Sequence, residues 1–287
     1  MRKATESVLR IRPYAYSAWS VLTNLARAFG EYESGLLEAR EVKNILAIII
    51  TSNRGLCGSF NAQVIKKVKE EIENPKELKI NRVGNEKVES NISDKELKVD
   101  FITVGKKGES LARKLKKNII ASFPELTYLP NIENTRPLSK MVIDEYLAKK
   151  YDKVVIIYTD YVSTVVQRTK IRQILPISKA DLEKQISEMG DSTKEHKLDE
   201  PESEYKVEPN PQEVLNHIFP RLIEMQIYHA ILESNASKES ARMVAMRNAT
   251  EAAGEMSEGL NLAYNQIRQM KITQEIAEIS AGQAALE

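Results

Sequence analysis

The chain has 287 residues with 42 basic and 41 acidic side chains, so its net charge of +1 suggests neither nucleic acid nor an acidic substrate as a partner. Its single cysteine, Cys57, excludes an internal disulfide and is typical of a reducing compartment. The longest apolar run, Ile45 to Ile50, is too short to span a bilayer, and the opening MRKATESVLRIR lacks the apolar segment of a signal peptide. These features predict a soluble intracellular protein.

Residues 1–43 are predicted to contain a coiled-coil helix. Apolar residues follow one another at spacings of four and three, and this average period of 3.5 lets one helix pack along another. Pro13 should bend the helix locally. The residues with this spacing are Ala4, Val8, Ile11, Ala15, Ala18, Leu22, Leu25 and Phe29.

A stretch that looks like an active site follows the first predicted strand, NILAIII. In ITSNRGLCGSFN, residues 50–61, two glycines, an arginine and the cysteine lie between a strand and a helix. The stretch has neither the GxxxxGK[ST] pattern of a phosphate loop nor the GxGxxG pattern of a dinucleotide turn. Cys57 could be a nucleophile at a helix N-terminus, but the three histidines lie far along the chain, in a polar loop and a long helix. They also lack metal-ligand spacing, so we predict no catalytic, metal or cofactor residues.

We instead interpret residues 54–58 as a structural turn. Gly55 and Gly58 should permit a tight bend between strand and helix. Leu56 and Cys57 are expected to pack inward, whereas Arg54 should project outward.

Residues 44–178 are predicted to form an α/β domain, because buried strands alternate with helices. This order favours a small, open, mostly parallel sheet. The polar, proline-containing residues 74–98 and 188–211 indicate long loops or partly ordered insertions, and residues 179–210 are assigned to a charged loop. The expected strands are 44–50, 99–104, 154–158 and 165–171, and the expected helices are 61–73, 108–117 and 138–150.

Residues 211–287 are predicted to form one long helix, and the two terminal helices are expected to pair as an antiparallel coiled coil. A second apolar stripe, Ile272, Ile276 and Ile279, leaves the end of this helix apolar on more than one side. Such a surface requires something that encloses it. The coiled-coil positions are Met246, Ala249, Ala253, Met256, Leu260, Ala263, Ile267, Met270, Gln274, Ala277, Ala281 and Ala284.

Several of these segments resemble one protein family. ITSNRGLCGSFN is similar to the SDRGLCGGFN signature of the gamma subunit of the rotary proton-translocating ATP synthase. The segment from SKESARMVAMRNAT to the end resembles that family's last helix, and LRIRPYAYSAWSVLTNLA resembles part of its first. The family opens with a further helical stretch before the position that matches Met1, so we expect either a truncated chain or a natural variant.

The resemblance implies a central rotor shaft, without catalytic activity of its own, that couples proton flow to the cycling of the catalytic subunits. The implied partners are the alpha, beta and epsilon subunits and the membrane c-ring, on the cytoplasmic face of a bacterial inner membrane. Contact with the membrane is expected only through the complex. The implied contacts with the catalytic head are Arg242, Arg268, Gln269, Thr273 and Glu275, and those with the ring and epsilon are Tyr205 and Glu208.

An alternative of another class is an α/β enzyme or ligand-binding domain with helical oligomerisation arms. Nucleotide binding by the isolated chain would favour this alternative.

Overall fold

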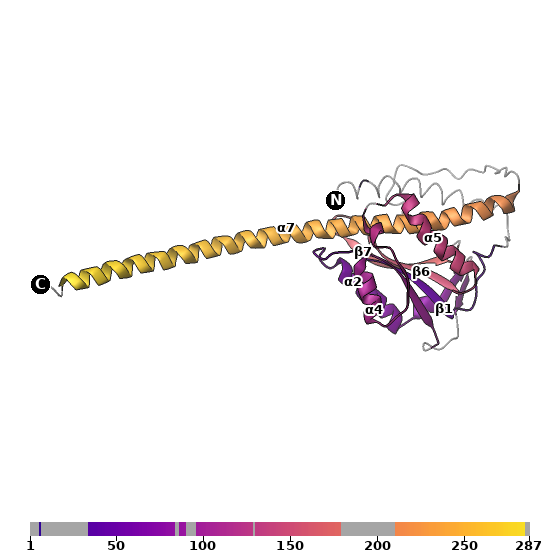
Figure 1. The fold of residues 1–287 in the computed structure, drawn as a ribbon, viewed down its shortest axis with the longest axis horizontal. Helices are drawn as coiled ribbons and strands as arrows, with labels where there is room; N and C mark the ends of the chain where they lie inside the picture. Colours follow the sequence, from indigo (N-terminus) through magenta and orange to yellow (C-terminus); the bar gives the residue numbers. More distant parts are fainter. Residues whose placement is uncertain are drawn as a thin grey trace. The chain divides into compact units, whose positions relative to one another are not determined.

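The computed structural model describes residue 6 and residues 34–83, 86–89, 96–128, 130–178 and 210–284 (Figure 1). The chain divides into two compact units, Met1–Arg242 and Met243–Glu287. The predicted N-terminal heptads lie outside the described residues, and so does the expected pairing of the two terminal helices. Residues 34–43 are described and form a turn and an irregular segment rather than helix.

The first unit is built around a five-stranded sheet with the strand order β5-β4-β1-β6-β7. The central β1 pairs in parallel with β4 and β6, β4 pairs in parallel with β5, and β7 is an antiparallel edge strand. The predicted open, mostly parallel α/β sheet is therefore confirmed. The strands are β1 (Asn44–Ile50), β4 (Lys98–Val104), β5 (Ile119–Ser122), β6 (Lys153–Tyr161) and β7 (Gln167–Leu175).

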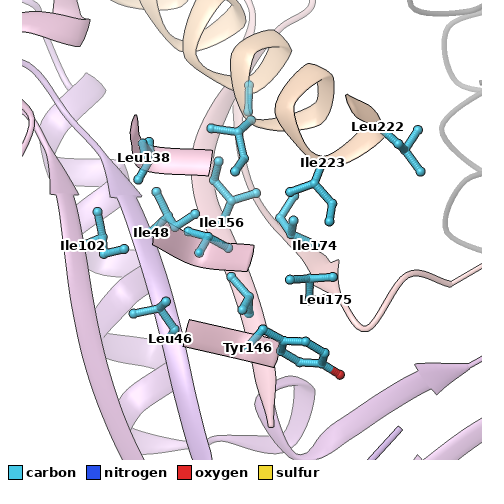
Figure 2. Close-up of a cluster of buried hydrophobic side chains, with 14 of the residues drawn as sticks. Leu46, Ile48, Ile102, Leu138, Tyr146, Ile156, Ile174, Leu175, Leu222 and Ile223 are labelled. Carbon is cyan, nitrogen blue, oxygen red and sulfur yellow. The ribbon is translucent and has the colours of Figure 1, made fainter. Parts of the chain in front are cut away.

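Both faces of the sheet are covered, because every residue of β1 from Ile45 to Ile50 is buried. Side chains alternate between the faces of a strand, so Leu46, Ile48 and Ile50 join one core, and Ile45, Ala47 and Ile49 join the other. The first core contains residues of helices α5 (Ile132–Leu147) and α7 (Pro211–Ala284), as Figure 2 shows. The second contains residues of α2 (Phe60–Glu73) and α4 (Lys106–Lys114).

Two predicted helices begin earlier than the sequence indicated. Helix α5 starts six residues before the expected Leu138 and includes Pro137. A proline within a helix removes one backbone hydrogen bond, but here the start is secured by the Asn134 side chain, whose Oδ1 accepts from the Asn131 N–H at 2.9 Å. Helix α4 starts at Lys106 because Gly105, with φ of 100°, turns the chain directly after β4.

Residues 74–98 were predicted to be a long loop or a partly ordered insertion, and the described part of this segment has regular structure that the sequence did not indicate. It contains helix α3 (Lys76–Lys79) and the antiparallel hairpin of β2 (Ile80–Val83) and β3 (Glu86–Glu89). The buried Lys153 of β6 holds the segment in place, because its Nζ donates to the carbonyls of Leu78 and Ile80 at 3.2 and 2.6 Å.

Helix α7 belongs to both units. Up to Arg242 its apolar side chains are buried in the first unit, whereas the large apolar side chains of the second unit are exposed. Among the described residues, no helix combines the length and the apolar composition that crossing a membrane requires. The buried apolar residues of the first part that join the main core are Leu215, Phe219, Leu222, Ile223, Ile227, Ala230 and Ile231.

Candidate functional site: the strand-to-helix turn and the α7 surfaces

The turn between β1 and α2 differs in detail from the prediction. Gly58 has a φ of 54°, in the left-handed region that favours glycine, as expected for a tight bend. The second residue with positive φ is Leu56, at 60°, rather than Gly55. Leu56 does not pack inward but is 75 % exposed, because the backbone directs its side chain to solvent. Arg54 projects outward and Cys57 is buried, as predicted.

The Cys57 thiol lies within a local hydrogen-bonded cluster. The Asn61 side-chain Nδ2–H donates to Cys57 Sγ at 3.1 Å and to Ser52 Oγ at 2.8 Å, and Asn61 Oδ1 accepts from the Ser52 N–H at 3.0 Å. Cys57 also packs against Phe60 and against Ala241 of α7, and only 2 % of it is exposed. This arrangement ties the end of β1 to the start of α2 and joins both to α7.

Asn53 makes a second connection that the sequence reasoning missed. Its side-chain amide donates to the Pro124 carbonyl and to Thr127 Oγ1, both at 2.9 Å, and its Oδ1 accepts from the Lys106 N–H at 3.0 Å. Pro124–Thr127 is a short 3-10 helix, η1. One asparagine of the turn therefore holds the start of α4 and both ends of η1.

The part of α7 near Arg242 is bound to η1 through buried polar side chains. Lys238 Nζ donates to the Thr127 carbonyl at 2.6 Å and to Asn235 Oδ1 at 3.1 Å, and Asn235 Nδ2 donates to the Leu126 carbonyl at 3.3 Å. Burial lowers the pKa of the Lys238 ammonium, and the nearby Glu239 carboxylate opposes this effect. Asn53 and Lys238 lie within segments that resemble the family, but the local sequence does not indicate which distant residues they or Asn235 contact, so only the folded structure reveals these contacts.

Arg242 forms an ion pair with Glu239, with 2.6 Å between Nη1 and Oε1. Burial tends to raise the pKa of the Glu239 carboxyl, but its bonds to Arg242 and the Lys238 charge outweigh burial and hold the pKa below its usual value. The predicted head contact Arg242 is therefore half-buried and already paired within the first unit.

A second polar group joins α7 to the end of β6 and to β7. The Asp160 carboxylate lies 2.7 Å from Lys170 Nζ, and the buried His229 and Glu233 of α7 lie 3.5 Å apart. Burial tends to raise the pKa of Asp160, but hydrogen bonds with Glu233 and Lys170 outweigh it and lower the pKa.

The remaining predicted head contacts lie on the exposed helix of the second unit. Arg268, Gln269, Thr273 and Glu275 are all exposed, and Thr273 Oγ1 donates to the Gln269 carbonyl at 2.9 Å. At about 100° per residue, Arg268 and Glu275 project to one side of the helix, and Gln269 and Thr273 project to another. The predicted foot contacts Tyr205 and Glu208 lie outside the described residues.

The same helix exposes two apolar stripes. Ile267 and Met270 of the heptad series lie about 170° around the helix from Ile272 and Ile276, so the two stripes lie on nearly opposite sides. Their members, with the other large apolar side chains from Met256 to Ile279, are between 49 and 68 % exposed. The complete set is Met256, Leu260, Leu262, Tyr264, Ile267, Met270, Ile272, Ile276 and Ile279.

Within the described part of the chain, no group of three or more histidine, cysteine, aspartate or glutamate side chains could hold a metal ion. The candidates for function described above are the exposed helix of the second unit and, in the first unit, the contacts of the β1–α2 turn with η1 and α7.

Comparisons with known proteins agree with this picture. A family model described as ATP synthase matches residues 1–286. The chain is 34% identical to an ATP synthase gamma chain of Legionella pneumophila strain Corby over 286 residues, covering 100% of this chain and 89% of that one. It is 36% identical over 288 residues to an ATP synthase gamma chain of Roseiflexus castenholzii, covering 100% and 88%.

Solved structures share the fold. A chain in the Euglena gracilis mitochondrial ATP synthase (OSCP, F1 and c-ring, rotational state 3) aligns with a TM-score of 0.57 at 17% identity, covering 99% of this chain and 90% of that one. A chain in the central stalk and c-ring of the Tetrahymena thermophila mitochondrial enzyme aligns with a TM-score of 0.50 at 23% identity, covering 86% and 99%. On the sequence matches, this chain belongs to the family of ATP synthase gamma chains.

Proposed function

We propose that this chain is the central rotor shaft of an ATP synthase. It would couple proton flow through a membrane c-ring to conformational cycling of alpha and beta subunits, with an epsilon subunit as a further partner. The relatives are ATP synthase gamma chains, and the similar structures come from the rotor and central stalk of that enzyme. By this proposal the chain acts on the cytoplasmic face of the membrane and reaches it through the complex.

The observation that carries the proposal is the exposed, two-sided apolar surface of the second unit. Large contiguous apolar surface is rare on isolated soluble proteins and typical of surfaces that a partner covers. A helix whose stripes lie on nearly opposite sides cannot bury both against one flat partner. It suits a position in which other chains surround it, as a shaft inside a ring of catalytic subunits would be.

The mechanism follows from the unequal sides of the helix. A shaft can change the conformation of a surrounding subunit only if its contacts with that subunit's states differ in free energy. The Arg268 and Glu275 side presents opposite charges, whereas the Gln269 and Thr273 side is uncharged. As the shaft turns, each surrounding subunit meets these sides in succession, so its nucleotide affinity changes with the rotational position.

We place the contact with the catalytic head at Arg268, Gln269, Thr273 and Glu275, with Arg242 as a further member. An arginine guanidinium can form paired hydrogen bonds to a carboxylate in one position and release them in the next. Tyr205 and Glu208 are proposed contacts with the c-ring and epsilon. Catalysis itself is assigned to the other subunits, so the isolated chain should bind no nucleotide.

The test is reconstitution with alpha and beta subunits, using Arg268→Ala combined with Gln269→Ala. Both residues are exposed, so the double variant should fold normally and assemble, while ATP turnover falls severalfold. Lys66→Ala with Glu70→Ala is the matched control, because it removes an exposed helical ion pair of α2. Unchanged turnover in the double variant would contradict the contact, and nucleotide binding by the isolated chain would favour the enzyme alternative.

A further inference from the structure

The proposed function leaves unexplained the polar side chains that α7 buries at its end within the first unit. Lys238 is 5 % exposed and Asn235 is also 5 % exposed, although lysine and asparagine usually lie at the surface. Burying an ammonium is costly unless acceptors surround it. Lys238 Nζ donates hydrogen bonds to the Thr127 carbonyl at 2.6 Å and to Asn235 Oδ1 at 3.1 Å, and it forms an ion pair with Glu239 Oε1 at 3.4 Å. Two hydrogen bonds and one ion pair therefore offset the cost of burying the ammonium.

The neighbouring apolar contacts cannot do what these bonds do. Near this end of α7, small residues face the first unit: Ala236 and Ala241 make apolar contacts, whereas Ser237 Oγ donates a hydrogen bond to the Thr159 carbonyl of β6 at 3.2 Å. Apolar contact resists separation but is not directional, so a helix with small side chains can turn about its own axis at little cost. Hydrogen bonds that project from the helix to fixed carbonyls are directional and lengthen as soon as the helix turns.

The acceptors on the other side are themselves fixed. The Leu126 and Thr127 carbonyls belong to η1, and Asn53 binds η1 through the Pro124 carbonyl and Thr127 Oγ1. Asn53 follows β1 by three residues, so the connection runs from the central strand through Asn53 and η1 to Asn235 and Lys238 on α7. No step of this path depends on apolar contact.

We propose that Lys238 and Asn235 are positioning residues that lock α7 to the α/β unit against rotation about the helix axis, and so pass torque between them. This inference rests on the proposed function as a rotor shaft. Within the described residues, a force applied to the exposed helix beyond Arg242 reaches the α/β unit through the contacts that α7 makes up to that residue. Within the last two turns before it, Lys238 and Asn235 make the buried directional contacts with η1, and Ser237 adds one with the Thr159 carbonyl of β6.

The principal variant is Lys238→Met, which keeps the length and apolar stem of the side chain and removes its donors. The second variant, Asn53→Ala, removes the hydrogen bonds between the β1–α2 turn and η1. It keeps the inference testable if Lys238→Met fails to fold. Lys69→Met, at an exposed position of α2, is the matched control. In the isolated chain, amide exchange at residues 125–128 should accelerate about tenfold in both lock variants, as the loss of a charged hydrogen bond implies, and not in the control.

The decisive measurement uses the assembled complex, fixed through its catalytic subunits, with a bead attached to the α/β unit. While the motor is stalled, both lock variants should widen the distribution of bead angles, and they should lower the number of protons pumped per ATP hydrolysed. A merely structural role would reduce assembly without changing either quantity in the complexes that form. If the unmodified complex rotates normally and the lock variants match it in both readouts, the inference is wrong and the rotor function stands. If the unmodified complex does not rotate, the proposed function fails, and this inference fails with it.

Discussion

The side-chain amide of Gln173 on β7 binds both backbone polar groups of Arg82 on β2. Gln173 Oε1 accepts from the Arg82 N–H at 3.2 Å, and Gln173 Nε2 donates to the Arg82 carbonyl at 2.9 Å. The side-chain amide of Gln173 thereby makes the same pair of hydrogen bonds with Arg82 that a backbone amide of a neighbouring strand could make. These bonds join β2 to β7 of the five-stranded sheet. It holds the β2–β3 hairpin, which the sequence alone presents as a polar insertion.

Replacing Gln173 with alanine should lower the free energy of unfolding by about 1–3 kcal/mol, because three partly buried hydrogen bonds are lost together, the two with Arg82 and one to the Pro176 carbonyl. Urea denaturation of the isolated chain measures this change. Gln167→Ala is the control on the same strand, since Gln167 donates only to the Thr164 carbonyl in the β6–β7 turn. Equal effects of the two variants would contradict the anchoring role of Gln173.

The two glycines of the β1–α2 turn should respond differently to alanine. Gly58→Ala places a side chain at a φ of 54° and should cost about 1–2 kcal/mol. Gly55→Ala should be neutral or slightly stabilising, because Gly55 has no positive φ and an added Cβ would meet nothing within 4 Å. Thermal denaturation of both variants measures the two changes in stability. If Gly55→Ala were destabilised, the turn would require glycine at position 55 as well as at position 58, as the sequence suggested.

Asp160 should make part of the stability depend on acid pH. Its pKa is lower in the folded chain than in the unfolded one, so its contribution is fully present above the unfolded pKa and is lost as the pH falls through the folded pKa. The parent should exceed Asp160→Asn by about 1–3 kcal/mol at pH 7, since the charged bond to Lys170 is weakened. Urea titrations should find this difference constant down to about pH 5 and shrinking below about pH 4. If the difference in the free energy of unfolding between the parent and Asp160→Asn grew as the pH fell, the pKa of Asp160 would be raised by folding rather than lowered.

The apolar surface of the second unit should matter for assembly rather than for folding. Leu260 is 65 % exposed, so Leu260→Gln should change the free energy of unfolding of the isolated chain by less than about 0.5 kcal/mol. Assembly with alpha and beta subunits, followed by gel filtration, should become weaker. Leu222→Gln is the contrasting variant, because Leu222 is buried in the main core and its replacement should unfold the chain. Normal assembly with Leu260→Gln would show that partners do not cover this surface.

Much of the fold could be predicted because the signals are local. The β-branched run of β1 indicates a strand buried on both faces, and the alternation of strands and helices indicates a mostly parallel sheet. The edge strand β5 was missed because its four residues are only partly buried. The β2–β3 hairpin was missed because Lys153 and Gln173, far along the chain, hold it in place.

The functional residues also fall into those with a local sequence signal and those whose contacts are with distant residues. Arg268, Gln269, Thr273 and Glu275 could be proposed from the sequence, since they lie within one helical segment whose resemblance to the family is continuous. Leu56 was misassigned because apolar residues in turns usually pack inward, and only the backbone conformation reveals that this one is exposed. Asn53, Asn235 and Lys238 bind residues far away along the chain, so the local sequence could not identify their partners.

As a rotor shaft, this chain should turn inside a ring of catalytic subunits. A thiol introduced by Lys69→Cys can report this rotation, because Cys57 is 2 % exposed and the introduced thiol is then the only accessible one. The complex with alpha and beta subunits is fixed to a surface through the catalytic subunits, a bead is coupled to this thiol, and ATP is added. We expect the bead to rotate in one direction, at a rate that rises with ATP concentration. ATP hydrolysis by the same complexes with a stationary bead would show that the chain is not a rotor shaft.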